Sequence, residues 1–290
     1  MWLSAYCLHK SLRVRASPSK ARITPGLPSD DVEGGKKPVV NTFFHILHGD
    51  TLAESNAAII AVWKQAWSNA GFHPRVLSLT DAEKHADYSD IVSQAEGIPG
   101  IGNNKYEQMC YLRYFAMSAS GGGFMADYDT VPLNIVAADY TDGRLPNDGN
   151  FTNFSRNPAL LSGSDKEWDR VARALVQEGE KKIGNYDMTK NPPFSDMLAL
   201  FGLTDNKEVM WDGSRLPKCG IMEFPTIKEP DAVDCDCAGP ALHVSHHDSK
   251  STGVPIHLRG LAMGEFMNNY HLACGGPAFF KSPNNSSKIS

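Results

Sequence analysis

The stretch SASGGGFMADYDTVPL, residues 118–133, decides the fold that we expect for this chain. Three consecutive glycines allow a tight turn, because glycine adopts positive φ at no steric cost. Residues 124–126 then predict a short buried strand, and Asp127 and Asp129 follow at its carboxyl end. Side chains two positions apart on an extended chain point the same way, so the two carboxylates should converge. We expect Pro132 to end the hydrogen bonding of the strand and to keep the acidic turn in a loop.

Two converging carboxylates repel each other unless a cation neutralises them. Hard divalent ions take oxygen ligands, and phosphate oxygens commonly complete their coordination. The acidic pair therefore predicts a metal-bridged phosphate at the end of the strand. Asp-x-Asp alone is a weak signal, since the same residues also form Asx turns with solvated carboxylates.

Upstream of this stretch, the hydrophobic pattern alternates between strands and helices. VVNTFFHILHG, residues 39–49, predicts a strand that ends near His48. Residues 51–71 carry apolar side chains at helical spacing, with a capping threonine at the start and a glycine at the end. HPRVLSLTD, residues 73–81, predicts a second strand. This order predicts an α/β fold with a single Rossmann-like mixed sheet flanked by helices, whose strand carboxyl ends face one crevice.

A second helix is expected from about Asn104 to Ser118, and its apolar residues on nearly every side predict that it is buried. Arg113 lies in the middle of this helix. A buried guanidinium is costly unless it pairs with an anion and uses its donors. Arg113 therefore either pairs with a core carboxylate or reaches a ligand site, and the residues alone leave both alternatives open.

Length, charge and hydropathy exclude several classes of protein. A chain of 290 residues is long enough to bury a substantial core. Its formal net charge of -5 provides no basic field for nucleic-acid binding. No apolar run approaches the ~20 residues of a transmembrane helix, so we expect no transmembrane segment in the given chain. We expect a basic leader or linker rich in Pro, Gly and Ser at residues 1–37, a catalytic domain at 38–275 and a flexible tail at 276–290.

YLRYFAMSASGGGFMADYDTVPL, residues 111–133, resembles the signature of the DXD sugar-binding glycosyltransferases related to initiating α-mannosyltransferases. That signature runs Arg-Tyr, an apolar helix end, Gly-Gly, an apolar strand and Asp-x-Asp. A looser likeness extends over FFHILHG, residues 43–49, and WKQAWSNAGFHPRVLSLTD, residues 63–81. The resemblance implies a GT-A type nucleotide-diphospho-sugar transferase fold and a nucleotide-sugar donor. It also implies a divalent metal, usually Mn²⁺ with Mg²⁺ as the alternative, and retention at the anomeric carbon.

The resemblance also implies roles for individual residues. Asp129 is expected to bind the metal directly, and Asp127 to share in the metal site while contacting ribose or sugar hydroxyls. Arg113 is assigned to the donor site, and we place Tyr128 in the same donor-binding set. The chain departs from the family at Cys110, where the family has an aspartate three residues before the arginine. This departure removes an expected contact with a sugar hydroxyl, and it keeps a non-catalytic nucleotide-sugar-binding relative as an alternative.

The segment ALHVSHHDSKS, residues 241–251, offers three histidines behind an apolar strand. Imidazole is a common metal ligand, and a GT-A site often includes a late histidine. The spacing to serine in the family's His-x-x-x-x-Ser element matches best at His246, with Ser251 as the serine. His246 is therefore our first choice for the third metal ligand, and His243 is the second.

The segment NPPFSDMLALFGL, residues 191–203, places Asp196 at the start of an apolar helix. Ser195 or Asp196 can simply cap that helix, which is the plain structural interpretation. GT-A enzymes commonly place a carboxylate at such a helix to orient or deprotonate the acceptor hydroxyl. On that resemblance, Asp196 and Arg113 are the predicted catalytic residues.

These inferences predict a metal-dependent hexosyltransferase that moves a sugar from a nucleotide-diphosphate donor to a glycan, lipid or protein hydroxyl. The alternative enzyme is a phosphohydrolase of the haloacid dehalogenase type, because FMADYDTV also fits its strand and acidic pair. In that enzyme Asp127 would be the nucleophile and Asp129 the general acid/base. The class also needs a later lysine and a second acidic pair, for which the sequence offers poor candidates. The resemblance favours the Golgi or secretory lumen, and the residues leave the compartment open.

Overall fold

The computed structural model describes residues 37–47, 53–155, 157–211, 239–246 and 253–274. The chain divides into two units, Met1–Glu33 and Gly34–Ser290, and all described residues belong to the second. The expected leader lies outside the described residues except for its last residue, and the expected tail lies outside them completely. Within the described part, no helix combines the length and the apolar character needed to cross a membrane.

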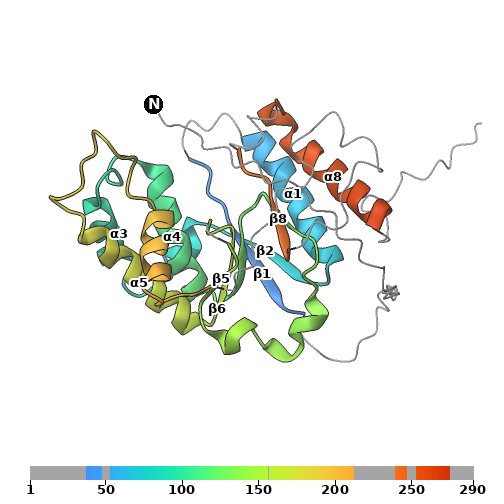
Figure 1. Cartoon of the computed structure of the whole chain (residues 1–290), viewed down its shortest axis with the longest axis horizontal. Helices are drawn as coiled ribbons and strands as arrows, with labels where there is room; N and C mark the ends of the chain where they lie inside the picture. Colours follow the sequence, from blue (N-terminus) through green and yellow to red (C-terminus); the bar gives the residue numbers. More distant parts are fainter. Residues whose placement is uncertain (1–36, 48–52, 156, 212–238, 247–252, 275–290) are drawn as a thin grey trace, which may run out of the picture. The chain divides into compact units, whose positions relative to one another are not determined.

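The second unit contains a six-stranded mixed sheet with the strand order β2-β1-β3-β6-β5-β7. Strands β1, β2, β5 and β6 of this sheet are labelled in Figure 1. Strand β1 (Val39–Phe43) lies between β2 (His73–Leu77) and β3 (Gly123–Ala126), and it is parallel to both. The β1-α1-β2 order matches the expected strand, helix and strand. The predicted α/β class with a mixed, helix-flanked sheet is therefore confirmed.

The other half of the sheet makes it mixed. Strand β6 (Leu160–Gly163) pairs antiparallel with β3 and with β5 (Thr152–Asn153), and β7 (Met210–Trp211) is parallel to β5. The turn before β3 requires glycine at Gly122, which has a φ of 71°. A Cβ there would lie 2.5 Å from the backbone nitrogen of Asp165, so a larger residue would push the turn away from α5.

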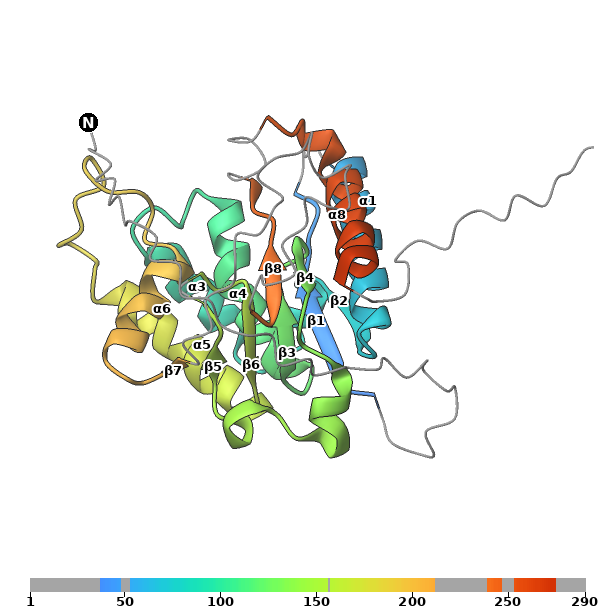
Figure 2. The same cartoon turned by 45° about the vertical axis from the view of Figure 1, so that its right-hand side comes forward.

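Two groups of helices cover opposite faces of the sheet (Figure 2). One group consists of α1 (Ala53–Asn69) and α8 (Arg259–Cys274). The other consists of α3 (Tyr88–Gly97), α4 (Lys105–Ala119), α5 (Asp165–Glu180) and α6 (Asp196–Asp205). Shorter helical segments lie in the connections between the main elements: α2 (Leu79–Ala82), η1 (Ala137–Gly143), η2 (Pro146–Gly149) and η5 (Ile256–Leu258).

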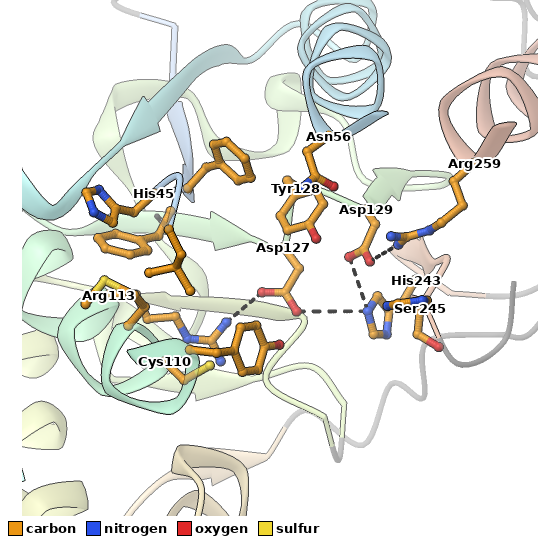
Figure 3. Close-up of a pocket in the computed structure, with 16 residues that line it drawn as sticks. His45, Asn56, Cys110, Arg113, Asp127, Tyr128, Asp129, His243, Ser245 and Arg259 are labelled. Carbon is orange, nitrogen blue, oxygen red and sulfur yellow. Dashed lines mark hydrogen bonds and ion pairs between the residues drawn. The ribbon is translucent and has the colours of Figure 1, made fainter. Parts of the chain in front are cut away.

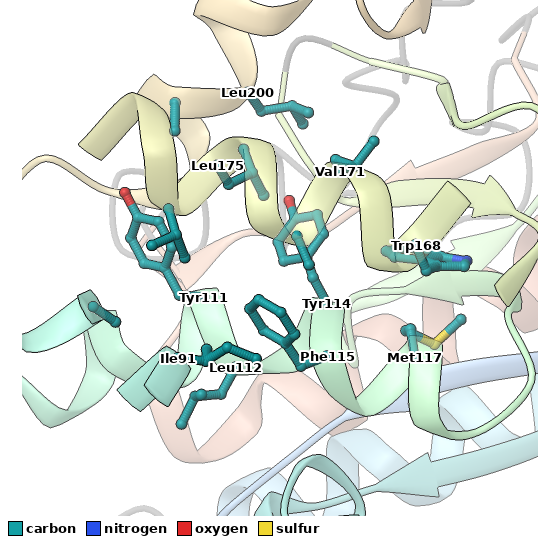
Figure 4. Close-up of a cluster of buried hydrophobic side chains, with 14 of the residues drawn as sticks. Ile91, Tyr111, Leu112, Tyr114, Phe115, Met117, Trp168, Val171, Leu175 and Leu200 are labelled. Atoms are coloured by element: carbon teal, nitrogen blue, oxygen red, sulfur yellow. The ribbon is translucent and has the colours of Figure 1, made fainter. Parts of the chain in front are cut away.

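Strand β3 contributes to both hydrophobic cores because its side chains alternate. Phe124 and Ala126 pack into the core under α1 and α8, whereas Met125 packs into the core under α4 and α5. The second core contains Trp168 of α5 and two tyrosines of α4, Tyr111 and Tyr114 (Figure 4). Burial of these large aromatic side chains fixes α4 against the sheet, so the position of Arg113 on that helix is well determined.

Most predicted elements are confirmed, with two corrections at the ends of strands. Strand β1 ends at Phe43, and the predicted extension towards His48 is wrong for the residues described. The Phe44 nitrogen still donates to the Leu77 oxygen at 2.8 Å, after which the chain leaves the sheet. Phe44 and Leu47 instead line a pocket, which accounts for an apolar run that is longer than the strand.

The second correction concerns Pro132, because Asp127–Asp129 do form a turn after β3, but Pro132 lies in a further strand and is not what ends the hydrogen bonding of β3. The chain continues directly into β4 (Thr130–Pro132), which pairs antiparallel with β8 (Ala241–His243). Pro132 is the last residue of this two-stranded sheet, a position where proline is tolerated. The pairing places Thr130 opposite His243 and so brings a distant histidine next to the acidic turn.

Candidate functional site

A pocket of about 690 Å³ lies where β1 and β3 end. Charged and polar side chains of its wall come from the acidic turn, from β8 and the segment after it, from α8 and from Arg113 of α4 (Figure 3). Apolar side chains come from the end of β1, the segment after it and Met109 of α4. The lining residues are Phe43, Phe44, His45, Leu47, Asn56, Tyr106, Met109, Cys110, Arg113, Asp127, Tyr128, Asp129, His243, Ser245, His246 and Arg259.

Three ligand atoms converge in this pocket. Asp127, Asp129 and His243 each offer one ligand atom, and all these atoms lie within 4.8 Å of one another. The His243 Nε2 lies 3.3 Å from Asp129 Oδ1 and 3.9 Å from Asp127 Oδ2. Two carboxylate oxygens and one imidazole nitrogen form a donor set that suits a divalent cation.

One carboxylate oxygen of each aspartate accepts a hydrogen bond from an arginine. Arg113 Nη1 donates to Asp127 Oδ1 at 2.7 Å, and Arg259 Nη2 donates to Asp129 Oδ2 at 2.5 Å. The other carboxylate oxygens, Asp127 Oδ2 and Asp129 Oδ1, face His243. The arginines thus orient both carboxylates and leave one oxygen of each for a bound ion.

The two neighbouring carboxyl groups have opposite pKa shifts. Burial raises the pKa of Asp127, and the opposing effects of Arg113 and His243 do not cancel that rise. Burial also acts to raise the pKa of Asp129, but His243 and Arg259 outweigh it, so the net pKa lies below its usual value. Asp129 is therefore the better stabilised anion of the pair, which suits a direct metal ligand.

The structure distinguishes between the two candidate histidines. His243, the second choice, lies among the acidic ligand atoms. His246, the first choice, lines the pocket but is exposed and is not in that group. The reason is the register of β4 against β8, which pairs His243 with Thr130 directly after Asp129. Ser251, on which the predicted choice rested, lies outside the described residues.

The alternatives left open for Arg113 turn out to be compatible with each other. Its Nη2 donates to Asp196 Oδ2 at 2.6 Å, so it pairs with a core carboxylate while it lines the pocket. Asp196 is 4% exposed and does not line the pocket. The cap of α6 is Ser195, whose side chain accepts from the Leu198 nitrogen at 3.4 Å. The Asp196 carboxylate thus points to Arg113 and does not reach the pocket.

Cys110 and Tyr128 both line the pocket. Burial, with a smaller effect from Asp196, raises the pKa of the Cys110 thiol well above its usual value, so the thiol is neutral at neutral pH. The ligand atoms of Cys110, Glu107 and Asp196 also lie within 4.8 Å of one another. Burial, together with the charge of Asp129, raises the pKa of Tyr128 to about 12, and its hydroxyl stays protonated as a hydrogen-bond donor.

The sequence interpretation missed Arg259, which is 3% exposed at the first position of α8. The signal available was weak: an arginine that precedes a segment with several apolar residues but also with a glutamate, two asparagines and a histidine. The interpretation also missed Asn56 and His45, which line the pocket from α1 and from the segment after β1. His45 lies within the stretch FFHILHG, but neither residue was marked as a site residue by its type or spacing.

A family model described as a domain of unknown function (DUF8765) matches residues 35–192, more than half of the chain. The matched span includes Arg113 and the acidic turn, and it ends before Asp196, His243 and Arg259. No curated protein and no solved structure matches the chain.

Proposed function

The chain belongs to the DUF8765 family of domains of unknown function, and we propose that it is a metal-dependent glycosyltransferase of the GT-A type. It would transfer a hexose from a nucleotide-diphosphate donor to an acceptor hydroxyl. The observation that carries the proposal is the convergence of Asp127 Oδ2, Asp129 Oδ1 and His243 Nε2 beside two arginines. The pocket volume of 690 Å³ falls within the range of about 300–1,000 Å³ that is common for ligand sites.

The donor set fits a divalent cation, with Mn²⁺ as first choice and Mg²⁺ as second. Asp127, Asp129 and His243 would hold it. Carboxylate oxygens suit both ions, and the imidazole favours the softer Mn²⁺. When bound, such an ion neutralises charge that develops on a diphosphate leaving group.

The charges in and beside the pocket favour the binding of a cation first and of an anionic ligand after it. Asp127 and Asp129 in the pocket and Asp196 behind its wall carry three negative charges, and Arg113 and Arg259 carry two positive charges. This cluster has one net negative charge alone and would have one net positive charge with a divalent ion. A diphosphate is then attracted only to the loaded site, where Arg113 adds a fixed cation in the pocket wall.

Asp196 is better suited to hold Arg113 than to act on the acceptor. Its carboxylate is buried, and one of its oxygens accepts from Arg113 at 2.6 Å. We therefore assign Asp196 to the positioning of Arg113 and leave the acceptor unassigned. Retention at the anomeric carbon, which the resemblance implies, does not require a strong base in the pocket.

The phosphohydrolase alternative receives less support from the geometry. Asp127 would have to be a free nucleophile, whereas its Oδ1 accepts from Arg113 at 2.7 Å. That chemistry also uses a lysine, and the pocket wall formed by the described residues contains none. The Cys110 departure keeps a third outcome, a protein that binds a nucleotide-sugar without turning it over.

One panel experiment separates the three outcomes. The full chain is incubated with Mn²⁺ and a set of nucleotide-sugars, and release of nucleoside diphosphate is measured. Slow Mn²⁺-dependent hydrolysis supports the transferase, phosphate release from simple phosphate esters supports the phosphohydrolase, and binding without turnover supports the non-catalytic relative. Asp129→Asn keeps the side-chain shape and should lose at least ~100-fold in turnover, since the metal loses a charged ligand. The exposed Asp139→Asn serves as the control.

A second variant tests the departure at Cys110. Cys110→Asp restores the family residue on the pocket wall, next to Asp196 and Glu107. If the binding-only outcome is caused by the thiol, this variant gains turnover with at least one sugar of the panel. If it folds and gains none, the missing aspartate is not the reason for inactivity.

A further inference from the structure

We propose that Arg259 couples two binding events in the pocket, by weakening the binding of the cation and strengthening the binding of the anion that follows it. The inference rests on the cation site proposed above. It adds a specific residue, outside the resemblance and outside the matched family span, that makes the two ligands dependent on each other.

Two hydrogen bonds and burial hold the Arg259 guanidinium beside Asp129. Its Nη2 donates to Asp129 Oδ2 at 2.5 Å and to the Val244 oxygen at 2.9 Å. The Val244 nitrogen in turn donates to the Asp129 backbone oxygen at 2.8 Å, which closes a ring of hydrogen bonds. The side chain is 3% exposed but still lines the pocket.

The position of Arg259 predicts effects of opposite sign on the two ligands. A cation that binds Asp129 Oδ1 is repelled by the guanidinium on the other oxygen of the same carboxylate. An anion that binds the loaded pocket is attracted by the same guanidinium. Unit charges a few ångström apart in a half-buried site change an equilibrium constant by about tenfold or more.

A purely structural role predicts a different result. If Arg259 served only to orient Asp129, its loss would weaken the binding of the cation, and the binding of the anion would weaken as a consequence. If Arg259 served only to join α8 to β8, its loss would change stability and neither affinity. The sign of the change in cation affinity therefore separates coupling from orientation.

The test uses the full chain and two probes, Mn²⁺ and inorganic pyrophosphate. Arg259→Gln removes the charge but keeps a donor for Asp129, and Arg259→Lys keeps the charge. Mn²⁺ affinity is measured from the electron paramagnetic resonance signal of the free ion. Pyrophosphate affinity is measured calorimetrically on Mn²⁺-saturated protein. We expect Arg259→Gln to bind Mn²⁺ about tenfold more tightly and pyrophosphate about tenfold more weakly. We expect Arg259→Lys to stay within about threefold of the parent for both, because it keeps the charge.

Arg75→Met is the matched control. Arg75 also bonds one side-chain oxygen, Asn41 Oδ1 at 2.7 Å, and one backbone oxygen, that of Ser120 at 3.1 Å, but it does not line the pocket. It should change neither affinity. Arg259→Met is the second neutral variant if the glutamine variant does not fold.

Three results would count against the coupling. The coupling is overturned if a folded neutral variant binds both Mn²⁺ and pyrophosphate more weakly, or if both affinities stay unchanged. A lysine variant that behaves like the glutamine variant also overturns it, because charge would not be the cause. Failure of the parent chain to bind Mn²⁺ is a separate result, since it rejects the proposed cation site itself.

Discussion

The two arginine-aspartate pairs of the pocket look alike, but their surroundings differ. Arg113 is shared between two carboxylates, Asp127 and Asp196, whereas Arg259 is shared between Asp129 and a backbone oxygen. The Arg113 side therefore carries one net negative charge, and the Arg259 side is neutral. The pKa of Asp127 is raised and that of Asp129 is lowered, which follows the same division. One side supplies the negative charge that attracts a cation, and the other supplies a well stabilised ligand.

The two sides also belong to different parts of the fold. Arg113 is in the middle of α4, where Tyr111 also donates to the Phe194 oxygen at 2.8 Å and so holds the chain just before α6. Arg259 is the first residue of α8, which packs against α1. Each side thus depends on a different hydrophobic core, and each can be perturbed separately.

The largest expected effect comes from removing Arg113. Arg113→Met leaves Asp127 and the buried Asp196 without their cation, and breaking a buried pair costs about 3–5 kcal/mol. Urea unfolding should show this loss in the free energy of unfolding. Arg259→Met leaves only one carboxylate without its cation and should cost less. Arg173→Met is the control, because Arg173 is 42% exposed in its pairs with Asp87 and Asp169 and exposed pairs contribute about 0–1 kcal/mol. A cost for Arg113→Met no larger than that of the control would contradict the comparison.

The second effect displaces Arg259 without changing any charge. Gly260 lies so close to α1 that an added Cβ would be 3.0 Å from the Ile59 nitrogen and 3.1 Å from the Ala58 Cβ. Gly260→Ala should push α8 away from α1 and cost about 1–3 kcal/mol through overpacking. Mn²⁺ affinity should change with it, because Arg259 moves with the helix.

Gly202→Ala is the matched control, since Gly202 is also helical and its added Cβ meets nothing closer than Glu178 Oε2 at 3.6 Å. This control should be neutral or slightly stabilising, by up to about 1 kcal/mol, because alanine favours the helix. Equal losses in the two variants would show that the contact between α1 and α8 is not the cause.

The Arg113 side could be predicted from the sequence because its central residues are close together in the chain. The helix, the glycine turn, the strand and the acidic pair follow one another, so local periodicity fixes their relative positions. The buried Arg113 stood out by its chemistry alone. The partner Asp196 was predicted as a site residue, but its pairing with Arg113 depends on how α6 packs against α4, which a local pattern does not contain.

The Arg259 side could not be predicted because it depends on pairing between distant segments. Asp129 and Arg259 are 130 positions apart, and the register of β4 against β8 decides which histidine faces the acids. Alternation along β8 places Ala241 and His243 on one face, but the sequence does not show that this face meets Asp129. The spacing argument therefore selected His246 instead.

The smallest expected effect tests whether the ion pair between Asp196 and Arg113 influences ligand binding in the pocket. Ser195 caps α6 directly before Asp196, and Ser164 caps α5 with the same geometry, each accepting a backbone N–H at 3.4 Å. Ser195→Ala and Ser164→Ala should each cost about 1 kcal/mol in the free energy of unfolding. Only Ser195→Ala should weaken pyrophosphate binding to the Mn²⁺-loaded protein, by a few-fold, because fraying at the start of α6 loosens the carboxylate that holds Arg113. If both variants weaken pyrophosphate equally, global stability explains the change. If neither variant weakens pyrophosphate binding, Asp127 alone is enough to keep Arg113 in position. The second carboxylate on the Arg113 side would then make no difference to the pocket, and the Arg113 and Arg259 sides would behave alike.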